Sequence, residues 1–295
     1  MQTDSSQTPD YNKFWNLFDG VLVINLKSSV GRWENFQKKI GATIPEGKLH
    51  RIDAVNGQMW PGYGEKPWFT DRGVERAPFW GGTAGCALSH RIAIQYAQDK
   101  GWDNVLILED DVRFSLENAA IDCLAESLPP VTEKYFFYLG YNQPEPLGYR
   151  IRKGESAEVW RVAGVLATHA YVVPKSMYET VLNYLPTNDN VWEWISEYKA
   201  VDVLYRDFIA LLPGVRIYAL YPQVARQGDE PSDIALTGVS GAEMSSTLPP
   251  RSAWSIRGIV RFCFPCLSRM KNRLNSGRTK RRALRIGLPG FKKVA

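Results

Sequence analysis

Three consecutive acidic residues, Glu109, Asp110 and Asp111, follow directly on four apolar residues at 105–108. Neighbouring carboxylates repel one another unless a positive group lies among them. Hard divalent cations such as Mn2+ and Mg2+ prefer oxygen ligands, and they usually keep coordination positions open for substrate phosphates. The triplet therefore indicates a metal site for a phosphorylated substrate. The alternative is that these acids are solvated loop residues, or that one of them caps a helix.

The apolar run in front of the triplet is short and bounded, which is typical of a strand buried on both faces of a parallel sheet. Such strands end at a crevice in which ligands bind. Similar runs alternate along the chain with segments of helical periodicity. We expect strands near residues 21–26, 50–57, 135–140, 168–174 and 216–221, and helices near 32–40, 83–100, 116–128, 175–184 and 201–212. The alternation predicts an α/β fold with a mostly parallel sheet flanked by helices.

The chain has 295 residues, of which 44% are apolar, and this is enough for the core of one large domain. We expect residues 1–18 to form a polar leader whose aromatic side chains pack on that domain. Residues 58–82 and 141–158 show no clean period and are expected to be loops. No apolar run reaches the ~20 residues that span a bilayer. The first residues lack the basic and apolar regions of a signal peptide, so we expect a cytosolic protein.

Seven short motifs follow one another between residues 19 and 235. They are Val23–Leu26 with Arg32 behind it, Ala54–Gly57, Gly85–His90, Leu108–Asp111, Thr168–Tyr171, Val201–Asp202, and Gln227 with Ser232–Ile234. In this order they resemble glycosyltransferase family 25, which contains bacterial lipo-oligosaccharide galactosyltransferases and collagen hydroxylysine galactosyltransferases. Residues after about 240 lie outside the resemblance.

The resemblance implies a GT-A type fold, in which a Rossmann-like nucleotide half is merged with an acceptor half. It implies an inverting transfer from a nucleotide sugar, commonly UDP-galactose. The triplet then corresponds to the metal-binding acidic motif of GT-A enzymes. In this assignment Asp111 is the first metal ligand, Glu109 binds the metal directly or through water, and Asp110 accepts hydrogen bonds from the ribose or the sugar. The cation, Mn2+ or Mg2+, stabilises the leaving diphosphate as a Lewis acid.

The end of the first strand is a candidate for donor binding. Asn25 and Leu26 lie where the crevice rule places a uridine, although Leu26 also fits an ordinary core position. Arg32 lies one turn further on, where it reaches a phosphate or stays on a solvated helix face.

Two later motifs supply the remaining donor-binding candidates. We expect Ala54, Asn56 and Gly57 to let the base and the ribose approach the backbone closely. Ser89 and His90 lie in the helix that leads into the central strand, and for His90 the alternative is a hydrogen-bonded, half-buried side chain.

Further candidates have competing structural explanations. His169 is either a third metal ligand or an ordinary strand residue. One or two tryptophans of the set 60, 68, 80, 192 and 194 are expected to stack on sugar rings, but aromatic residues are also common core material.

Transfer to a hydroxyl group also needs a base that removes the hydroxyl proton. Asp202 is our candidate, because it matches the Val-Asp position of the family and precedes a predicted helix. The alternative role of Asp202 is that of a helix cap. Glu193, Glu197 and Asp233 are the competing candidates for the base.

The C-terminal segment 251–295 contains 13 Lys and Arg and no acidic residue, which leaves 23 basic against 31 acidic residues in the rest of the chain. Apolar residues recur at 256, 260, 263, 267, 270 and 274 in steps of three and four. This pattern, interrupted by Pro265, predicts a basic amphipathic helical tail that lies on an anionic membrane surface. Disorder is the second interpretation. Nucleic-acid binding fits the charge but leaves the apolar face unexplained, so we expect no nucleic acid.

The sequence thus predicts three regions: a leader at 1–18, a GT-A glycosyltransferase domain at 19–240, and a membrane-surface tail at 241–295. The expected activity is a metal-dependent, inverting transfer of a hexose, with galactose as first choice, from a UDP-sugar to a saccharide acceptor on a lipid such as lipo-oligosaccharide. We expect the enzyme to be peripheral at the inner membrane face. The alternatives are transfer to a collagen-like protein hydroxyl, and a catalytically inactive relative that acts as a membrane-bound scaffold.

Overall fold

The computed structural model describes residues 8–70, 77–143, 146–228, 249–252 and 261–288. The candidate base Asp233, the motif at 232–234 and the tail positions 256 and 260 lie outside the described residues.

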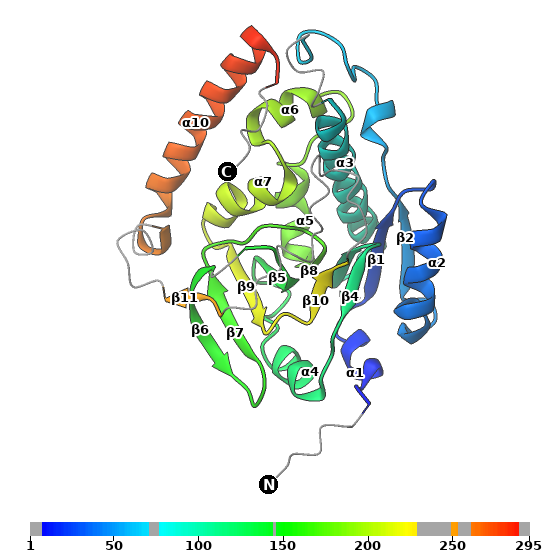
Figure 1. Cartoon of the computed structure of the whole chain (residues 1–295). Helices are drawn as coiled ribbons and strands as arrows, with labels where there is room; N and C mark the ends of the chain where they lie inside the picture. Colours follow the sequence, from blue (N-terminus) through cyan, green and yellow to red (C-terminus); the bar gives the residue numbers. More distant parts are fainter. Residues whose placement is uncertain (1–7, 71–76, 144–145, 229–248, 253–260, 289–295) are drawn as a thin grey trace.

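A mixed sheet forms the centre of the molecule (Figure 1). Within the described residues it has nine strands in the order β11-β6-β7-β9-β5-β8-β3-β1-β2. Their bounds are β1 Gly20–Asn25, β2 Leu49–Asp53, β3 Asn104–Glu109, β5 Tyr135–Gly140, β6 Leu147–Lys153, β7 Glu158–Val162, β8 Ala170–Pro174, β9 Arg216–Tyr221 and β11 Arg251–Ser252. The expected α/β sheet is therefore present.

Parallel pairing brings three strand ends to one edge of this sheet. β1 pairs in parallel with both β2 and β3, and the register places Asn25 beside Asp53 and Ile24 beside Glu109. β5 and β9 are also parallel, whereas β8 runs antiparallel between β3 and β5. A separate two-stranded sheet, β4 (Val112–Phe114) with β10 (Ala225–Gln227), sets Gln227 opposite Val112 and so returns the chain to the acidic triplet.

Helices cover both faces of the sheet. Val21 and Val23 of β1 pack on one face with α1 (Tyr11–Trp15), α2 (Val30–Lys39) and α4 (Asn118–Ala125). Leu22 and Ile24 pack on the other face with α3 (Ala77–Lys100), α5 (Lys175–Leu182), α6 (Val191–Tyr198) and α7 (Val201–Asp207). Because successive side chains of a strand point to opposite faces, a strand covered on both sides is apolar throughout. This explains the continuous apolar runs in the sequence.

Helix α3 begins earlier than its periodicity predicts, and residues 77–82 are helical rather than part of a loop. Its glycines explain the difference. The short 3-10 helix η2 (Gly57–Met59) lies directly against it, and a Cβ on Gly57 would come within 2.0 Å of the Gly81 carbonyl oxygen. A Cβ on Gly85 would come within 2.2 Å of the Val55 carbonyl oxygen. Glycine inside a helix weakens the sequence signal but allows this close approach.

Residues 147–162 are also not a loop, because β6 and β7 form an antiparallel hairpin there. Most β6 side chains are exposed. A strand with so little buried surface lacks the apolar alternation by which strands are predicted.

The described part of the basic tail is folded onto the body. Residues 261–263 are helical, and α10 (Pro265–Ile286) starts at the proline, which is a favourable first helical residue. Ser276 and Ala283 are the buried residues of α10, and Leu288, which follows the helix, packs into the core. Figure 1 shows α10 as the long orange helix beside α6 and α7. Among the described residues, no helix is long and apolar enough to cross a membrane.

Candidate functional site

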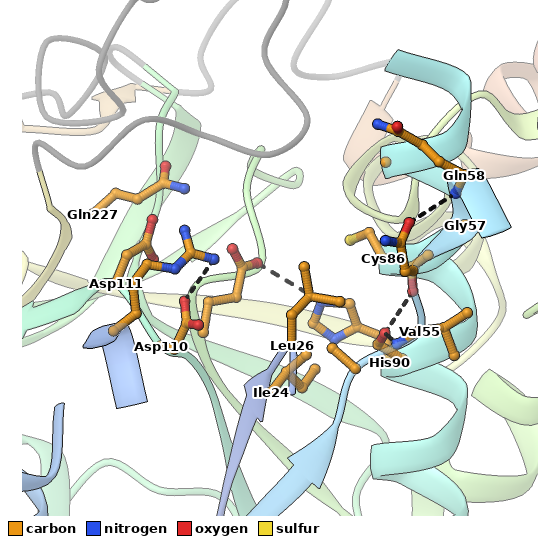
Figure 2. Close-up of a pocket in the computed structure, with 17 residues that line it drawn as sticks. Ile24, Leu26, Val55, Gly57, Gln58, Cys86, His90, Asp110, Asp111 and Gln227 are labelled. Carbon is orange, nitrogen blue, oxygen red and sulfur yellow. Dashed lines mark hydrogen bonds and ion pairs between the residues drawn. The ribbon is translucent and has the colours of Figure 1, made fainter. Parts of the chain in front are cut away.

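A pocket lies at the carboxyl ends of β1, β2 and β3, between α2, α3 and β10 (Figure 2). The residues predicted from the sequence for donor and metal binding line this pocket, with the exception of Asn25. These lining residues are Leu26, Arg32, Ala54, Asn56, Gly57, Ser89, His90, Glu109, Asp110 and Asp111. The switch from strand to loop at the end of a parallel strand exposes polar groups here, which is why the site forms at this edge.

Asp110 is held from two sides. The Arg32 guanidinium lies 3.1 Å from Asp110 Oδ1, and the Asn25 side-chain amide donates a hydrogen bond to Asp110 Oδ2. Asp110 is 4% exposed, whereas Arg32 retains 23% exposure toward the pocket. Asn25 does not line the pocket. Its role is to hold the Asp110 carboxylate, which in turn orients Arg32.

Glu109 is bonded on the opposite side of the triplet. It accepts a hydrogen bond from Thr168 Oγ1 at 2.9 Å, and its Oε1 lies 3.8 Å from His90 Nε2. Burial raises the pKa of Glu109, but the combined effect of His90, His169 and Thr168 is larger and in the opposite direction. The pKa of Glu109 therefore lies below its usual value. His90 is almost fully buried, and its Nδ1 lies 2.8 Å from the Tyr171 hydroxyl. This geometry agrees with the hydrogen-bonded alternative for His90.

Asp111 is the least satisfied carboxylate of the triplet. Its Oδ1 is buried and has no hydrogen-bond partner. Burial, with the nearby charges of Glu109 and Asp110, raises the pKa of Asp111 to about 7, against the opposing effects of Arg32 and a hydrogen bond with Gln227. A buried carboxylate with a raised pKa is stabilised by any cation that binds beside it.

The segment 54–57 forms the opposite wall. The Val55 N–H donates to Ser89 Oγ at 2.9 Å, and Ser89 in turn donates to the Gly85 carbonyl at 2.6 Å. Asn56 caps η2 through a hydrogen bond from the Gln58 N–H. Ser89 and Gly57 therefore hold the wall against α3, and the exposed side of the segment is left for a ligand.

Asp202 lies in the first turn of α7 and does not line the pocket. Its Oδ2 accepts from the Ala167 N–H at 3.1 Å, and its Oδ1 from the Val203 N–H at 2.7 Å. Burial raises the pKa of Asp202 despite these two hydrogen bonds, and the Glu109 charge adds to the increase. Ala167, the donor, has φ +75°, a left-handed conformation unusual for a residue with a Cβ.

The remaining candidates do not line the pocket. His169 is fully buried, and burial lowers its pKa, against the opposing effects of the Glu109 charge and the Ala225 backbone. None of the five tryptophans lines the pocket. Trp60 and Trp192 instead donate to the Asn188 and Pro61 carbonyls and tie the loop at 60–61 to the segment around α6.

Several lining residues were missed as site residues, namely Ile24, Val55, Gln58, Gly82, Gly85, Cys86 and Gln227. Of these, Ile24, Val55, Gly85, Cys86 and Gln227 lie inside motifs of the sequence. Gln227 is the most informative, because it is held by the Asn142 side-chain amide at 2.9 Å and contacts Asp111. No sequence pattern links residues 142 and 227, which are brought together by β5 and β10.

The carboxylates of the pocket determine how a metal ion would bind there. No group of three or more His, Cys, Asp and Glu side chains in the described parts of the chain is arranged to hold one. Mg2+ and related ions are, however, often held by one or two carboxylates together with substrate phosphates. The unpaired, buried oxygen of Asp111 fits that mode of binding, with Glu109 as the second carboxylate on the pocket wall.

The fold and the pocket define an α/β protein of Rossmann-like build, with a polar site at the carboxyl ends of parallel strands. Residues 18–192 match the family model described as glycosyltransferase family 25 (LPS biosynthesis protein), and the chain belongs to this family. The family membership makes the protein a transferase with a sugar donor and a saccharide acceptor. The match contains the whole acidic triplet and ends before α7.

Two further comparisons add little. No curated protein matches the chain. Among solved structures, it is similar to one described as mannose-1-phosphate geranyltransferase from Thermus thermophilus, with 13% identity, a TM-score of 0.36 and coverage of 68% of this chain and 73% of that one. A likeness of this size carries no argument about function.

Proposed function

We propose that the protein is a GT-A type, metal-dependent, inverting glycosyltransferase that moves a hexose from a UDP-sugar to a saccharide acceptor. The observation that carries the proposal is the pocket at the ends of β1, β2 and β3, which is lined both by the Arg32 cation and by Asp111, whose buried Oδ1 has no hydrogen-bond partner. A diphosphate needs positive charge on its oxygens. Arg32 supplies one positive group, and a cation on Asp111 would supply the second.

The two walls of the pocket support the donor orientation that we propose. The segment 54–57 and Leu26 offer backbone and apolar contacts to a uracil and ribose. The triplet lies on the other side, where the diphosphate belongs. Mn2+ or Mg2+, held by Asp111 and Glu109, would stabilise the negative charge of the departing UDP. Galactose as the hexose rests on the family resemblance.

Asp202 remains our proposed base. Its carboxylate is close enough to Glu109 for their charges to interact, and burial favours proton uptake by raising its pKa. A base must accept a proton near neutral pH, and a raised pKa serves this role. Of its competitors, Glu193 forms an ion pair with Lys280 on α10, and Glu197 lies beside it on the same helix.

Replacement of Asp202 by Asn tests the base. The amide keeps the size and can still cap nearby backbone groups, so we expect stability and UDP-sugar binding to persist while turnover falls by about 100-fold or more. Turnover and donor affinity are measured separately by product formation and by calorimetric titration. An equal loss of donor affinity would indicate a binding role for Asp202 instead.

We further propose that the acceptor is carried by a lipid, as on lipo-oligosaccharide, and that α10 brings the enzyme to an anionic membrane surface at the inner membrane face. Leu267, Met270 and Leu274 lie on its outer side with exposures of 51%, 59% and 58%. Arg278, Arg281 and Arg285 continue the same side and are exposed. Apolar side chains combined with basic charge suit the interface of an anionic bilayer.

The decisive experiment uses the full chain with a panel of UDP-sugars. We expect slow hydrolysis of one UDP-hexose, dependent on added Mn2+ or Mg2+ and abolished by a chelator. Transfer to a lipo-oligosaccharide acceptor should exceed this hydrolysis. A chain that binds no UDP-sugar with either cation would favour the scaffold alternative, and transfer to a hydroxylysine peptide alone would favour the protein-directed one.

A further inference from the structure

Arg261 is a largely buried cation of the C-terminal segment that the proposed chemistry does not use. Its side chain is 24% exposed and makes contacts with two elements at once. Nε donates to the Ala163 carbonyl at 3.2 Å, and Nη2 donates to the Arg206 carbonyl and approaches Asp207 Oδ1 at 3.4 Å. The guanidinium fork therefore joins the segment after β7 to the end of α7.

The contacts on α7 are those of a helix C-terminus. The last carbonyl groups of a helix have no partner inside it and carry partial negative charge. Arg261 bonds the Arg206 carbonyl, and Asn272 of α10 donates to the Asp207 carbonyl at 2.6 Å. Two residues of the C-terminal segment thus complete the end of the helix that carries Asp202 in its first turn.

The two elements joined by Arg261 also hold Asp202 between them. Ala167, four residues beyond Ala163, donates its N–H to Asp202 Oδ2. Between these contacts the backbone lies tightly on α7, because a Cβ on Gly164 would come within 2.7 Å of Arg206 Cγ. Segment 163–167 and α7 are therefore fastened twice, by Arg261 at one end and by the Asp202–Ala167 hydrogen bond at the other.

We propose that Arg261 is a positioning residue for Asp202, so that the docked C-terminal segment sets the place of the base. The inference rests on the proposed role of Asp202 as the base. Without the fork, α7 and segment 163–167 can shift relative to each other, and the carboxylate moves with them. A small displacement of a reacting group lowers turnover strongly while distant binding contacts are kept.

The test compares two variants that each remove one cation from the C-terminal segment. Arg261→Gln removes the fork. Lys280→Gln removes the ion pair between α10 and Glu193 of α6, so it removes a contact to a different helix. We expect Arg261→Gln to lower kcat for transfer by about tenfold or more with unchanged KM for the donor. Lys280→Gln should leave both constants unchanged.

Hydrogen exchange gives a second readout that needs no turnover. In the full chain without ligand, Arg261→Gln should speed exchange in segments 163–168 and 201–207, including the Ala167 amide, and Lys280→Gln should not. Arg261→Lys serves as a milder variant if the Gln variant does not fold, and it should show a smaller effect of the same kind. A folded Arg261 variant with wild-type exchange and wild-type kcat would overturn the proposal. Absence of any transfer by the wild-type chain would instead refute the proposed function, and exchange would still decide whether Arg261 fastens the two elements.

Discussion

Asp110 and Asp111 are neighbours in the sequence, but the fold gives them different surroundings. Asp110 is paired with Arg32 and Asn25, whereas Asp111 has a buried oxygen without a partner. We therefore expect a structural role for Asp110 and a ligand-binding role for Asp111, one position apart. The sequence predicts that both belong to a site, because they follow an apolar strand. It does not predict how their roles divide, because that depends on Arg32 and Asn25 of other elements.

Replacement of Asp111 by Asn separates these roles. We expect the variant to fold and to lose cation-dependent UDP binding by about tenfold or more, because the ligand to the cation is gone. Calorimetric titration with UDP, in the presence and absence of Mn2+, measures this. Asp110→Asn is the comparison variant. It should cost about 1–3 kcal/mol of stability, because Arg32 loses a charged partner, and it should weaken UDP binding equally with and without Mn2+. If cation-dependent UDP binding is unchanged in the Asp111 variant, Asp111 is not a ligand of the metal ion.

The raised pKa of Asp111 also predicts a pH dependence of stability. Its folded-state value is about 7, above that of an unfolded Asp, so the folded state binds the proton more tightly. The stability of the metal-free chain should therefore fall as pH rises between about 4 and 7, by at most about 1.4 kcal/mol per pH unit from this group. Urea unfolding at pH 5.5 and 7.5 in a chelator measures the difference. The slope should be smaller in Asp111→Asn, and an equal slope would assign it to other groups.

At the scale of elements, the buried strands of the sheet were largely predictable, whereas the exposed strand β6 and the start of α3 were not. β1, β3, β5 and β9 appear in the sequence as short apolar runs, because each is buried on both faces. β6 was missed because its side chains are mostly exposed, and the start of α3 was missed because Gly81 and Gly82 interrupt its pattern. Contacts between distant elements, such as Asn142 with Gln227, have no signature in a single sequence.

The close packing of α3 on the pocket wall gives a prediction at this scale. Gly85→Ala places a methyl group 2.2 Å from the Val55 carbonyl oxygen, so the wall must move. We expect a loss of about 1–3 kcal/mol and weaker UDP binding. Gly31→Ala on α2 is the matched control, because nothing lies within 4 Å of its added Cβ. It should stabilise the chain by about 0.5–1 kcal/mol, since alanine favours a helix. Thermal denaturation compares the two variants. Equal stabilities would show that segment 54–57 can move away from α3 without a cost in stability.

At the scale of the whole molecule, the C-terminal segment combines two surfaces. Asn272, Ser276, Lys280 and Ala283 face the body, whereas Leu267, Met270 and Leu274 face outward. The sequence predicted the amphipathic pattern but not the docking, because the body-facing residues are mostly polar. Removal of the whole segment would also remove Ala283 and Leu288 from the core. Truncation therefore does not isolate the membrane role that we propose for it.

Point substitutions isolate that role. Met270→Asp with Leu274→Asp should leave the fold intact and reduce sedimentation with anionic vesicles by about tenfold, because each charge opposes both insertion and lipid attraction. Ile92→Asp, an exposed apolar residue on α3, is the control and should sediment like the wild type. Binding should weaken as salt is raised. Equal sedimentation of the double variant and the wild type would exclude this face as the anchor.

Because β10 contacts the acidic triplet from a much later part of the chain, the site is completed late during synthesis. A chain leaves the ribosome N-terminus first, at about 5–20 residues per second. The triplet therefore emerges many seconds before Gln227, which contacts Asp111, and before Arg261, which closes the end of α7. During that interval three carboxylates stand at the edge of an incomplete sheet. If the proposed function holds, we expect the pocket to bind a nucleotide sugar only after residues 227 and 261 have been added.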